Sequence, residues 1–256
     1  MTGTLFGVGV GPGNPMQMTY EAVEIIKQTT HIAIPTAKPY AADTSFHNDT
    51  TSASPQNRGV LALNEILTKC SAYQIALGQV PELPDKKILP VYMPMTKNAP
   101  SLEKAHQEGA ALIQQYLDSG HDVAFLTLGD PTVYSTYMYV QQRLLPLGYN
   151  CRIISGIPSF CASAAELTEA LSVKDEMIHV IPASYPTLDA LHFPGTKVFM
   201  KSGKQLPRLL SELREHPELY QSVQMVENCG MPTQKCYSSL EEIPENAGYF
   251  TTIIVK

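Results

Sequence analysis

The sequence predicts an α/β protein with two α/β domains, in which the N-terminal sheet is mostly parallel and the C-terminal sheet is mixed. In the first half, short apolar runs alternate with helical patterns, as crossover connections between parallel strands require. In the second half the connections are shorter and proline stays frequent, which favours a mixed sheet. A chain of 256 residues is long enough for two cores. We expect the domains at residues 1–139 and 140–256.

The elements of the first half follow from the spacing of its apolar residues. Continuous apolar runs indicate buried strands, and apolar residues three and four positions apart indicate helices. The expected strands are residues 4–10, 31–35 and 122–128, and the expected helices are residues 16–29, residues 102–117 and a third that starts at Gly129-Asp130-Pro131. The polar stretch 36–57 has no periodicity, which is typical of a lid or of a disordered insertion.

The second half contains further strand-like runs and one amphipathic segment. Pro207 suits the first turn of a helix over residues 204–215, where its missing N–H costs nothing. The expected strands are residues 151–155, 177–182, 197–201, 222–227 and 249–255.

The composition argues against several classes of protein. Lys and Arg number 18 against 24 Asp and Glu, so the basic surplus by which a nucleic-acid binder neutralises phosphates is missing. No run approaches the roughly 20 apolar residues of a membrane helix, and the chain opens on a strand without the pattern of a secretory leader. The 5 cysteines are scattered, which favours free thiols in the cytoplasm over disulfides or a metal site.

The glycine-rich segment from Gly7 to Pro15 predicts a tight turn after the first strand. A nicotinamide-binding G-x-G-x-x-G would need Gly or Ala where Pro12, Asn14 or Met16 stands, so the spacing disfavours a dinucleotide site. Glycines in this position allow a ligand to approach the backbone closely. Asn14 is suited to cap the following helix, and Pro15 to occupy its first position.

A second loop, Gly129-Asp130-Pro131, has the same construction, with a glycine after a strand, an aspartate suited to cap a helix and a proline. Tyr134 and Ser135 follow it. Open α/β sheets bind ligands in the crevice at the carboxyl ends of their strands. Two loops of this kind therefore predict a ligand site at that edge of the N-terminal sheet.

The segments 9–15 and 129–135 together resemble the opening V-G-x-G-P-G-D-P and the central G-D-P-x-x-Y of the tetrapyrrole (corrin/porphyrin) methylase family. Residues 155–160 resemble the later P-G-x-S/T segment of that family, and residues 197–200 and 226–230 resemble the strands that complete its cofactor pocket. Asn14 replaces the usual Asp, Ser155 the usual Pro, and Pro158 the usual Ser or Thr. The resemblance extends over essentially the whole chain.

The resemblance implies a methyltransferase that uses S-adenosylmethionine. It also implies that this cofactor binds in a folded conformation in the cleft between the two domains. Carried over by position, the residues that contact the cofactor are Pro12, Leu128, Gly129, Asp130, Val133, Ser159, Met200 and Cys229. The residues expected to bind the substrate are Lys38, Arg58, Tyr134 and Ser135, with Lys97 and Lys104 as further cations beside the site. No constellation of catalytic acid, base or nucleophile is legible, so positioning and desolvation are expected to supply the rate.

Three features are similar to the branch of the family that methylates C-20 of precorrin-2 or cobalt-precorrin-2 in cobalamin biosynthesis. They are Pro94-Met95-Thr96, the run 122–131 and Tyr134-Ser135-Thr136-Tyr137. This similarity implies a tetrapyrrole substrate and a homodimer, with no nucleic-acid or membrane partner. The alternatives are a methylase acting at another corrin position and a homologue that binds S-adenosylmethionine without turnover, which the departures at Asn14 and Pro158 would fit.

Overall fold

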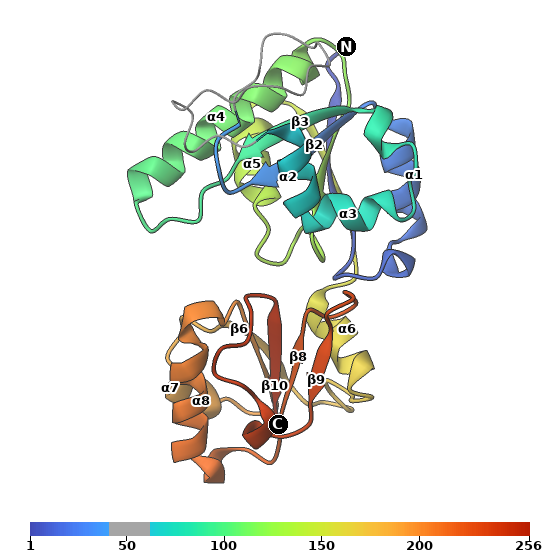
Figure 1. Cartoon of the computed structure of the whole chain (residues 1–256). Coiled ribbons are helices and arrows are strands. Elements are labelled where there is room, and N and C mark those ends of the chain that lie inside the picture. The colour runs from blue at the N-terminus through green and yellow to red at the C-terminus, as the bar shows by residue number, and fades with distance from the viewer. Residues whose placement is uncertain (41–61) are drawn as a thin grey trace. The chain divides into compact units, whose positions relative to one another are not determined.

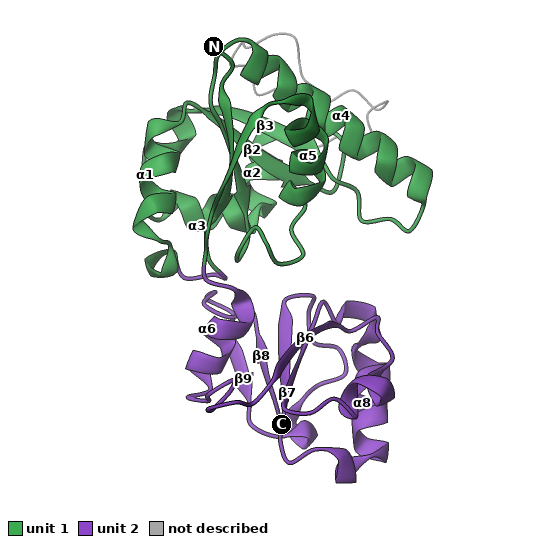
Figure 2. Ribbon diagram, turned by 180° about the vertical axis from the view of Figure 1, so that it is seen from behind, with its two compact units in different colours: residues 1–11, 15–156 green, residues 12–14, 157–256 purple. Residues whose placement is uncertain are grey.

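The computed structural model describes residues 1–40 and 62–256; most of the polar stretch 36–57, and Arg58, lie outside the described residues. The chain divides into two compact units, coloured separately in Figure 2. Unit 1 contains residues 1–11 and 15–156, and unit 2 contains residues 12–14 and 157–256. The chain thus passes from unit 1 into unit 2 at residues 12–14 and then returns to unit 1.

Unit 1 is built on a parallel sheet with the strand order β3-β2-β4-β1-β5, which confirms the predicted parallel N-terminal sheet. Its strands are β1 (Thr4–Gly9), β2 (His31–Thr36), β3 (Lys87–Tyr92), β4 (Val123–Thr127) and β5 (Asn150–Ile154). The sequence predicts the run 151–155 in the second domain, but β5 pairs with β1 of unit 1. Since α5 (Tyr137–Leu144) and β5 both belong to unit 1, the division falls after residue 156 and not at residue 139.

Helices cover both faces of this sheet. Figure 1 shows α1 and α3 on one face and α4 and α5 on the other. The side chains of β1 alternate between the two cores, because Val8 packs with Ile26 of α1 while Leu5 packs with Ile113 of α4 and Tyr137 of α5. The helices are α1 (Tyr20–Gln28), α2 (Leu63–Lys69), α3 (Ser71–Leu77), α4 (Ala99–Asp118) and α5 (Tyr137–Leu144).

Unit 2 has a mixed sheet with the order β6-β7-β10-β8-β9, as the sequence predicts. β6 and β7 are parallel, whereas β10 runs antiparallel to both β7 and β8. Its core joins Phe199 and Ile253 of the sheet to Leu209 of α8. The elements are β6 (Ile178–Pro182), β7 (Thr196–Met200), β8 (Val223–Glu227), β9 (Lys235–Tyr237), β10 (Thr251–Val255), α6 (Ser159–Glu166), α7 (Thr187–Leu191) and α8 (Leu206–Glu215).

Two predicted helix starts are wrong. Thr19, and not Asn14, caps α1, since its Oγ1 accepts a hydrogen bond from the N–H of Ala22 at 3.2 Å. The helix expected at Asp130 begins only at Tyr137. Elements that we did not predict are α2, α3, α6, α7, β3, β9 and the 3-10 turns η1 (Pro15–Gln17), η2 (Leu83–Asp85), η3 (Leu145–Leu147), η4 (Gly203–Gln205), η5 (Pro217–Leu219) and η6 (Leu240–Glu242).

Lys197 on β7 is a buried cation, with 5% of its surface exposed, and its Nζ donates a hydrogen bond to the carbonyl oxygen of Gly195 at 2.9 Å. Burial lowers the pKa of this amine. The folded state therefore binds fewer protons than the unfolded state between the lowered pKa and the usual value near 10.4, so stability rises with pH across that window. At neutral pH the charged amine carries the full cost of burial.

We therefore expect Lys197→Met to raise the free energy of unfolding at pH 7, because methionine occupies a similar volume without a buried charge. The gain should shrink as the pH approaches 10. Chemical denaturation at pH 7 and pH 9.5 measures both effects. A less stable variant at pH 7 would mean that the bond to Gly195 outweighs the cost of the buried charge.

Candidate functional site

Three glycines meet at the carboxyl ends of neighbouring strands of unit 1. Gly9 ends β1, Gly129 follows β4 and Gly156 follows β5. A Cβ atom on Gly156 would overlap the carbonyl oxygen of Gly129 and lie 2.8 Å from the carbonyl carbon of Gly9. A Cβ atom on Gly9 would in turn lie 2.7 Å from the same carbonyl oxygen of Gly129. The three strand ends can approach this closely only because Gly9 and Gly156 have no side chain.

The two glycine-rich loops are joined by backbone hydrogen bonds. The N–H of Gly129 donates to the carbonyl oxygen of Gly11 at 2.8 Å, and the N–H of Gly11 donates back at 3.3 Å. Both residues have a positive φ, of 77° at Gly11 and 71° at Gly129, a region that glycine enters at little cost. The loops that the sequence places at one edge of the sheet are therefore paired with each other.

The carboxylate of Asp130 is held by the protein. Its Oδ2 accepts the N–H of Gly156 at 3.0 Å, and its Oδ1 accepts the N–H of Thr132 at 2.8 Å and the Oγ1 hydroxyl of Thr132 at 2.5 Å. Only 7% of the residue is exposed. Asp130 is thus not a helix cap, because its oxygens bind the next turn of its own loop and the loop after β5.

The loop between Asp130 and α5 is strained and internally bonded. Tyr134 has a φ of 52°, which is uncommon for an aromatic residue, and partial burial raises the pKa of its hydroxyl. The hydroxyls of Ser135 and Thr127 lie 2.8 Å apart, and Ser135 Oγ also accepts the N–H of Tyr137 at 3.1 Å. Tyr134 is 42% exposed, so a ligand can reach this residue.

The remaining predicted residues of unit 1 lie along the same edge of the sheet. Leu128 and Val133 are half-buried on either side of Asp130. Lys38 is exposed two residues after the end of β2, the strand that neighbours β4. A turn fixes its backbone, since Thr36 Oγ1 donates to the carbonyl oxygen of Lys38 at 2.9 Å. Lys97 is exposed beyond the end of β3, next to β2.

In unit 2, the segment 12–14 packs against the loop that follows β8. A Cβ atom on Gly13 would overlap the carbonyl oxygen of Cys229 and lie 2.7 Å from the carbonyl carbon of Gly230. Cys229 is 5% exposed and packs with Ala162 of α6. Burial raises the pKa of its thiol, which favours the neutral form. Gly13, the residue after Pro12, is therefore packed against the backbone of Cys229. Pro12 and Cys229 are both predicted to contact the cofactor.

The other two predicted residues of unit 2 also stand at element ends. Ser159 is the first residue of α6, and Met200 is the last residue of β7. Because β10 is antiparallel to β7 and β8, its first residue lies at the same edge as Met200, and the register pairs Thr251 with Glu227 and Thr252 with Met200. Unit 2 therefore gathers Met200 and the loop after β8 at one sheet edge.

Sequence reasoning missed two buried hydroxyls at this edge. Ser202 is 1% exposed and Thr251 is 4% exposed, and within the described part of the chain neither hydroxyl oxygen has a hydrogen-bond partner. An unpaired buried hydroxyl costs stability unless a ligand satisfies it. No sequence signal identifies these two hydroxyls, since Ser and Thr are common residue types at the ends of strands.

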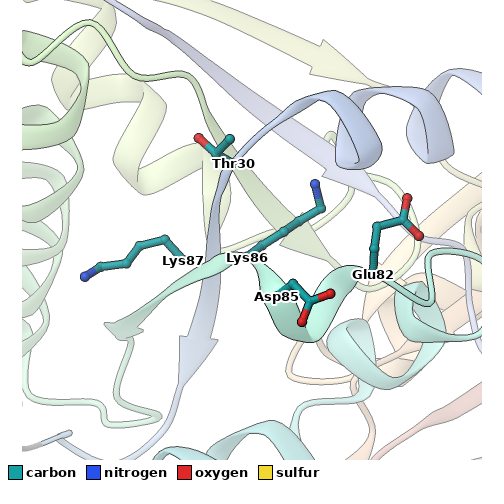
Figure 3. A pocket seen from close by; sticks show the side chains of 5 residues that line it. All are labelled: Thr30, Glu82, Asp85, Lys86 and Lys87. Atoms are coloured by element: carbon teal, nitrogen blue, oxygen red, sulfur yellow. The ribbon is translucent and has the colours of Figure 1, made fainter. Parts of the chain in front are cut away.

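The pocket in Figure 3 lies at the opposite edge of the unit 1 sheet. Thr30, Lys86 and Lys87 line it where β2 and β3 begin, together with Glu82 and Asp85. Lys86 Nζ donates to the carbonyl oxygens of Lys27 and Thr29 at 2.8 and 2.9 Å, so it caps the end of α1. The pocket therefore has a structural explanation and is remote from the glycine loops along the strands.

A family model described as Tetrapyrrole (Corrin/Porphyrin) Methylases matches residues 4–244. The chain belongs to this family. The resemblance found in the sequence is thereby confirmed. Among the described residues of this tetrapyrrole methylase, no helix is long and apolar enough to cross a membrane. No three His, Cys, Asp or Glu side chains in this part of the chain are grouped so that they could hold a metal ion.

Two curated proteins are similar to this chain over most of its length. The probable cobalt-precorrin-2 C(20)-methyltransferase of Methanocaldococcus jannaschii is 29% identical over 214 residues, which cover 84% of this chain and 78% of that protein. The precorrin-2 C(20)-methyltransferase of Sinorhizobium sp. is 27% identical, covering 99% of this chain and 95% of that protein.

A solved structure shows the same fold. The uroporphyrin-III C-methyltransferase from Thermus thermophilus, complexed with S-adenosylhomocysteine, has a TM-score of 0.62. It is 17% identical, and the match covers 99% of this chain and 97% of that one. The predicted α/β fold with two sheets is thus confirmed for this methylase.

Proposed function

We propose that this tetrapyrrole methylase transfers a methyl group from S-adenosylmethionine to C-20 of precorrin-2 or cobalt-precorrin-2 in cobalamin biosynthesis. The observation that carries the proposal is the similarity, over most of the chain, to relatives named for this one reaction. We prefer these two substrates to a ring methylated at another corrin position. The names of both relatives give the C(20) position, and they differ in whether the substrate contains cobalt.

The residues present suit a bound S-adenosylmethionine. Gly9 and Gly156, which pack against the backbone of Gly129, present no side chain at these strand ends, and a ligand can approach such a backbone closely. The unpaired hydroxyls of Ser202 and Thr251 offer donors and acceptors for polar groups of an adenosine. We propose that Pro12, Ser159, Met200 and Cys229 of unit 2, and Leu128, Gly129, Asp130 and Val133 of unit 1, form or support the cofactor site.

S-adenosylmethionine supplies a methyl group on a positively charged sulfur, which a nucleophilic ring carbon can accept. The protein's contribution is to hold the acceptor carbon in line with the methyl–sulfur bond and to exclude water. The rigid loop around Asp130 and the apolar side chains of Val133 and Met200 suit both tasks. The exposed ring of Tyr134, fixed by its strained backbone, offers a flat surface for the macrocycle.

Methyl transfer tests the proposed function directly. The protein is incubated without oxygen with S-adenosylmethionine and either precorrin-2 or cobalt-precorrin-2, and the mass of the product is followed. We expect one added methyl group, and a ¹³C label on the donor methyl should place it at C-20. The faster substrate assigns the metal-free or the cobalt route. Binding of S-adenosylhomocysteine without transfer to either ring would overturn the substrate assignment.

Recognition of the substrate's peripheral carboxylates should depend on Lys38 and Lys97. Neither has an ion-pair partner among residues 1–40 and 62–256, and both stand at the carboxyl edge of the unit 1 sheet. We expect Lys38→Met or Lys97→Met to raise KM for the tetrapyrrole about fivefold, as for the loss of ~1 kcal/mol, without changing the affinity for S-adenosylhomocysteine. Lys87→Met, at the amino end of β3, is the matched control. Equal effects of all three would contradict a local role.

We also propose that the protein is a homodimer in the cytoplasm. The 5 cysteines are all unpaired, as is usual in a reducing compartment. The family resemblance supports the dimer. Light scattering of the purified protein tests the dimer, because a particle of 28.1 kDa would contradict it.

A further inference from the structure

The hydrogen bonds of Asp130 leave little of its carboxylate for a ligand. A carboxylate offers about four acceptor positions, and three are occupied by the N–H of Gly156 and by the N–H and hydroxyl of Thr132. The residue is also 7% exposed. The bond to Gly156 joins residues 26 positions apart and is itself buried. A charged acceptor in such a place forms one of the stronger hydrogen bonds in a protein.

We propose that Asp130 is a positioning residue, which acts on the cofactor through the backbone of Gly156 and not by touching the cofactor itself. This inference rests on the proposed function and assigns one of its residues a different role. Gly156 stands at the end of unit 1, and three residues later the chain reaches Ser159 at the start of α6. By fixing Gly156, the carboxylate fixes the path of the chain toward a residue expected at the adenosine.

The same loop also fixes the other exit from unit 1. The chain leaves unit 1 after Gly11 and after Gly156. Gly11 is paired with Gly129 through two backbone hydrogen bonds, and Gly156 is bound by the adjacent residue, Asp130. The loop after β4 therefore anchors both exits within unit 1. Loosening Asp130 should affect the cofactor site even though every group that it binds belongs to the protein.

The exchange rate of the Gly156 amide hydrogen in the ligand-free protein tests this role. We expect Asp130→Ala to accelerate exchange at Gly156 at least tenfold, because the buried N–H loses its only charged acceptor. Asp130→Asn keeps one acceptor oxygen, so it should fold if the alanine variant does not, and should give a smaller acceleration. Thr132→Val is the matched control, since it removes one bond to the same carboxylate and leaves the bond to Gly156. Unchanged exchange at Gly156 in the Asp130 variants would overturn the proposal.

A second readout separates positioning from a purely structural role. We expect both Asp130 variants to bind S-adenosylhomocysteine about tenfold more weakly by calorimetry at a temperature well below unfolding, while Thr132→Val binds like the parent protein. Faster exchange at Gly156 with unchanged affinity would reduce Asp130 to a structural residue and overturn the proposal. Neither measurement uses a tetrapyrrole, so failure of the methyl-transfer assay with intact binding would contradict the proposed function and leave this inference standing.

Discussion

Gly156→Ala should destabilise unit 1 by about 3 kcal/mol or more and abolish cofactor binding. The new methyl group would overlap the carbonyl oxygen of Gly129 and crowd the backbone of Gly9. Both neighbours are backbone atoms of strand ends, so no side-chain rotation can relieve the contact. Any shift of residue 156 that makes room also lengthens its hydrogen bond to Asp130. Chemical denaturation and calorimetry with S-adenosylhomocysteine measure the two effects.

Two variants serve as controls for Gly156→Ala. Ser155→Ala changes the exposed neighbouring residue and should leave stability and binding unchanged. Gly148→Ala adds a methyl group at a φ of 89° where no atom lies within 4 Å, so it reports the cost of backbone strain alone, ~1 kcal/mol. If Gly156→Ala behaves like Gly148→Ala, the close approach of the three strand ends is not what shapes the site.

The regular strands were predictable because buried parallel strands are short continuous apolar runs. The bounds of β1, β2 and β4 each lie within one residue of the expected bounds. β3 escaped notice because Pro90 interrupts it, and proline is normally kept out of a sheet interior. Since β3 is the edge strand of the sheet, the missing N–H of Pro90 costs no interior ladder bond.

The site was predictable only in part. Helix-capping patterns involve residues that are close in the sequence, whereas the hydrogen bonds that shape this site join residues that are far apart in it. Asp130 followed by proline has the pattern of a helix start, yet its carboxylate binds Gly156, which lies 26 residues away. No local pattern shows that β5 joins the first sheet or that segment 12–14 packs in unit 2. Such pairings depend on which distant backbone groups meet, and a single sequence does not carry that information.

Gly13→Ala should weaken the binding of S-adenosylhomocysteine at least tenfold while leaving unit 1 folded. Gly13 lies in unit 2, where an added methyl group would overlap the carbonyl oxygen of Cys229 and lie 2.9 Å from the backbone nitrogen of Met231. The loop after β8 cannot easily give way, because the N–H of Asn228 donates to the carbonyl oxygen of Phe250 at 2.8 Å. The segment 12–14 must then move off the loop, taking Pro12 away from Cys229.

The free energy of unfolding should fall by about 1–3 kcal/mol, the usual cost of forcing an extra methyl group into a packed site. Hydrogen exchange measured by peptide can localise the change, since we expect faster exchange around residues 228–231 and unchanged protection in β1 and β4. If Gly13→Ala binds S-adenosylhomocysteine as the parent does, residues 12–14 are only a connection between the units. Their packing against Cys229 would then have no part in holding the cofactor.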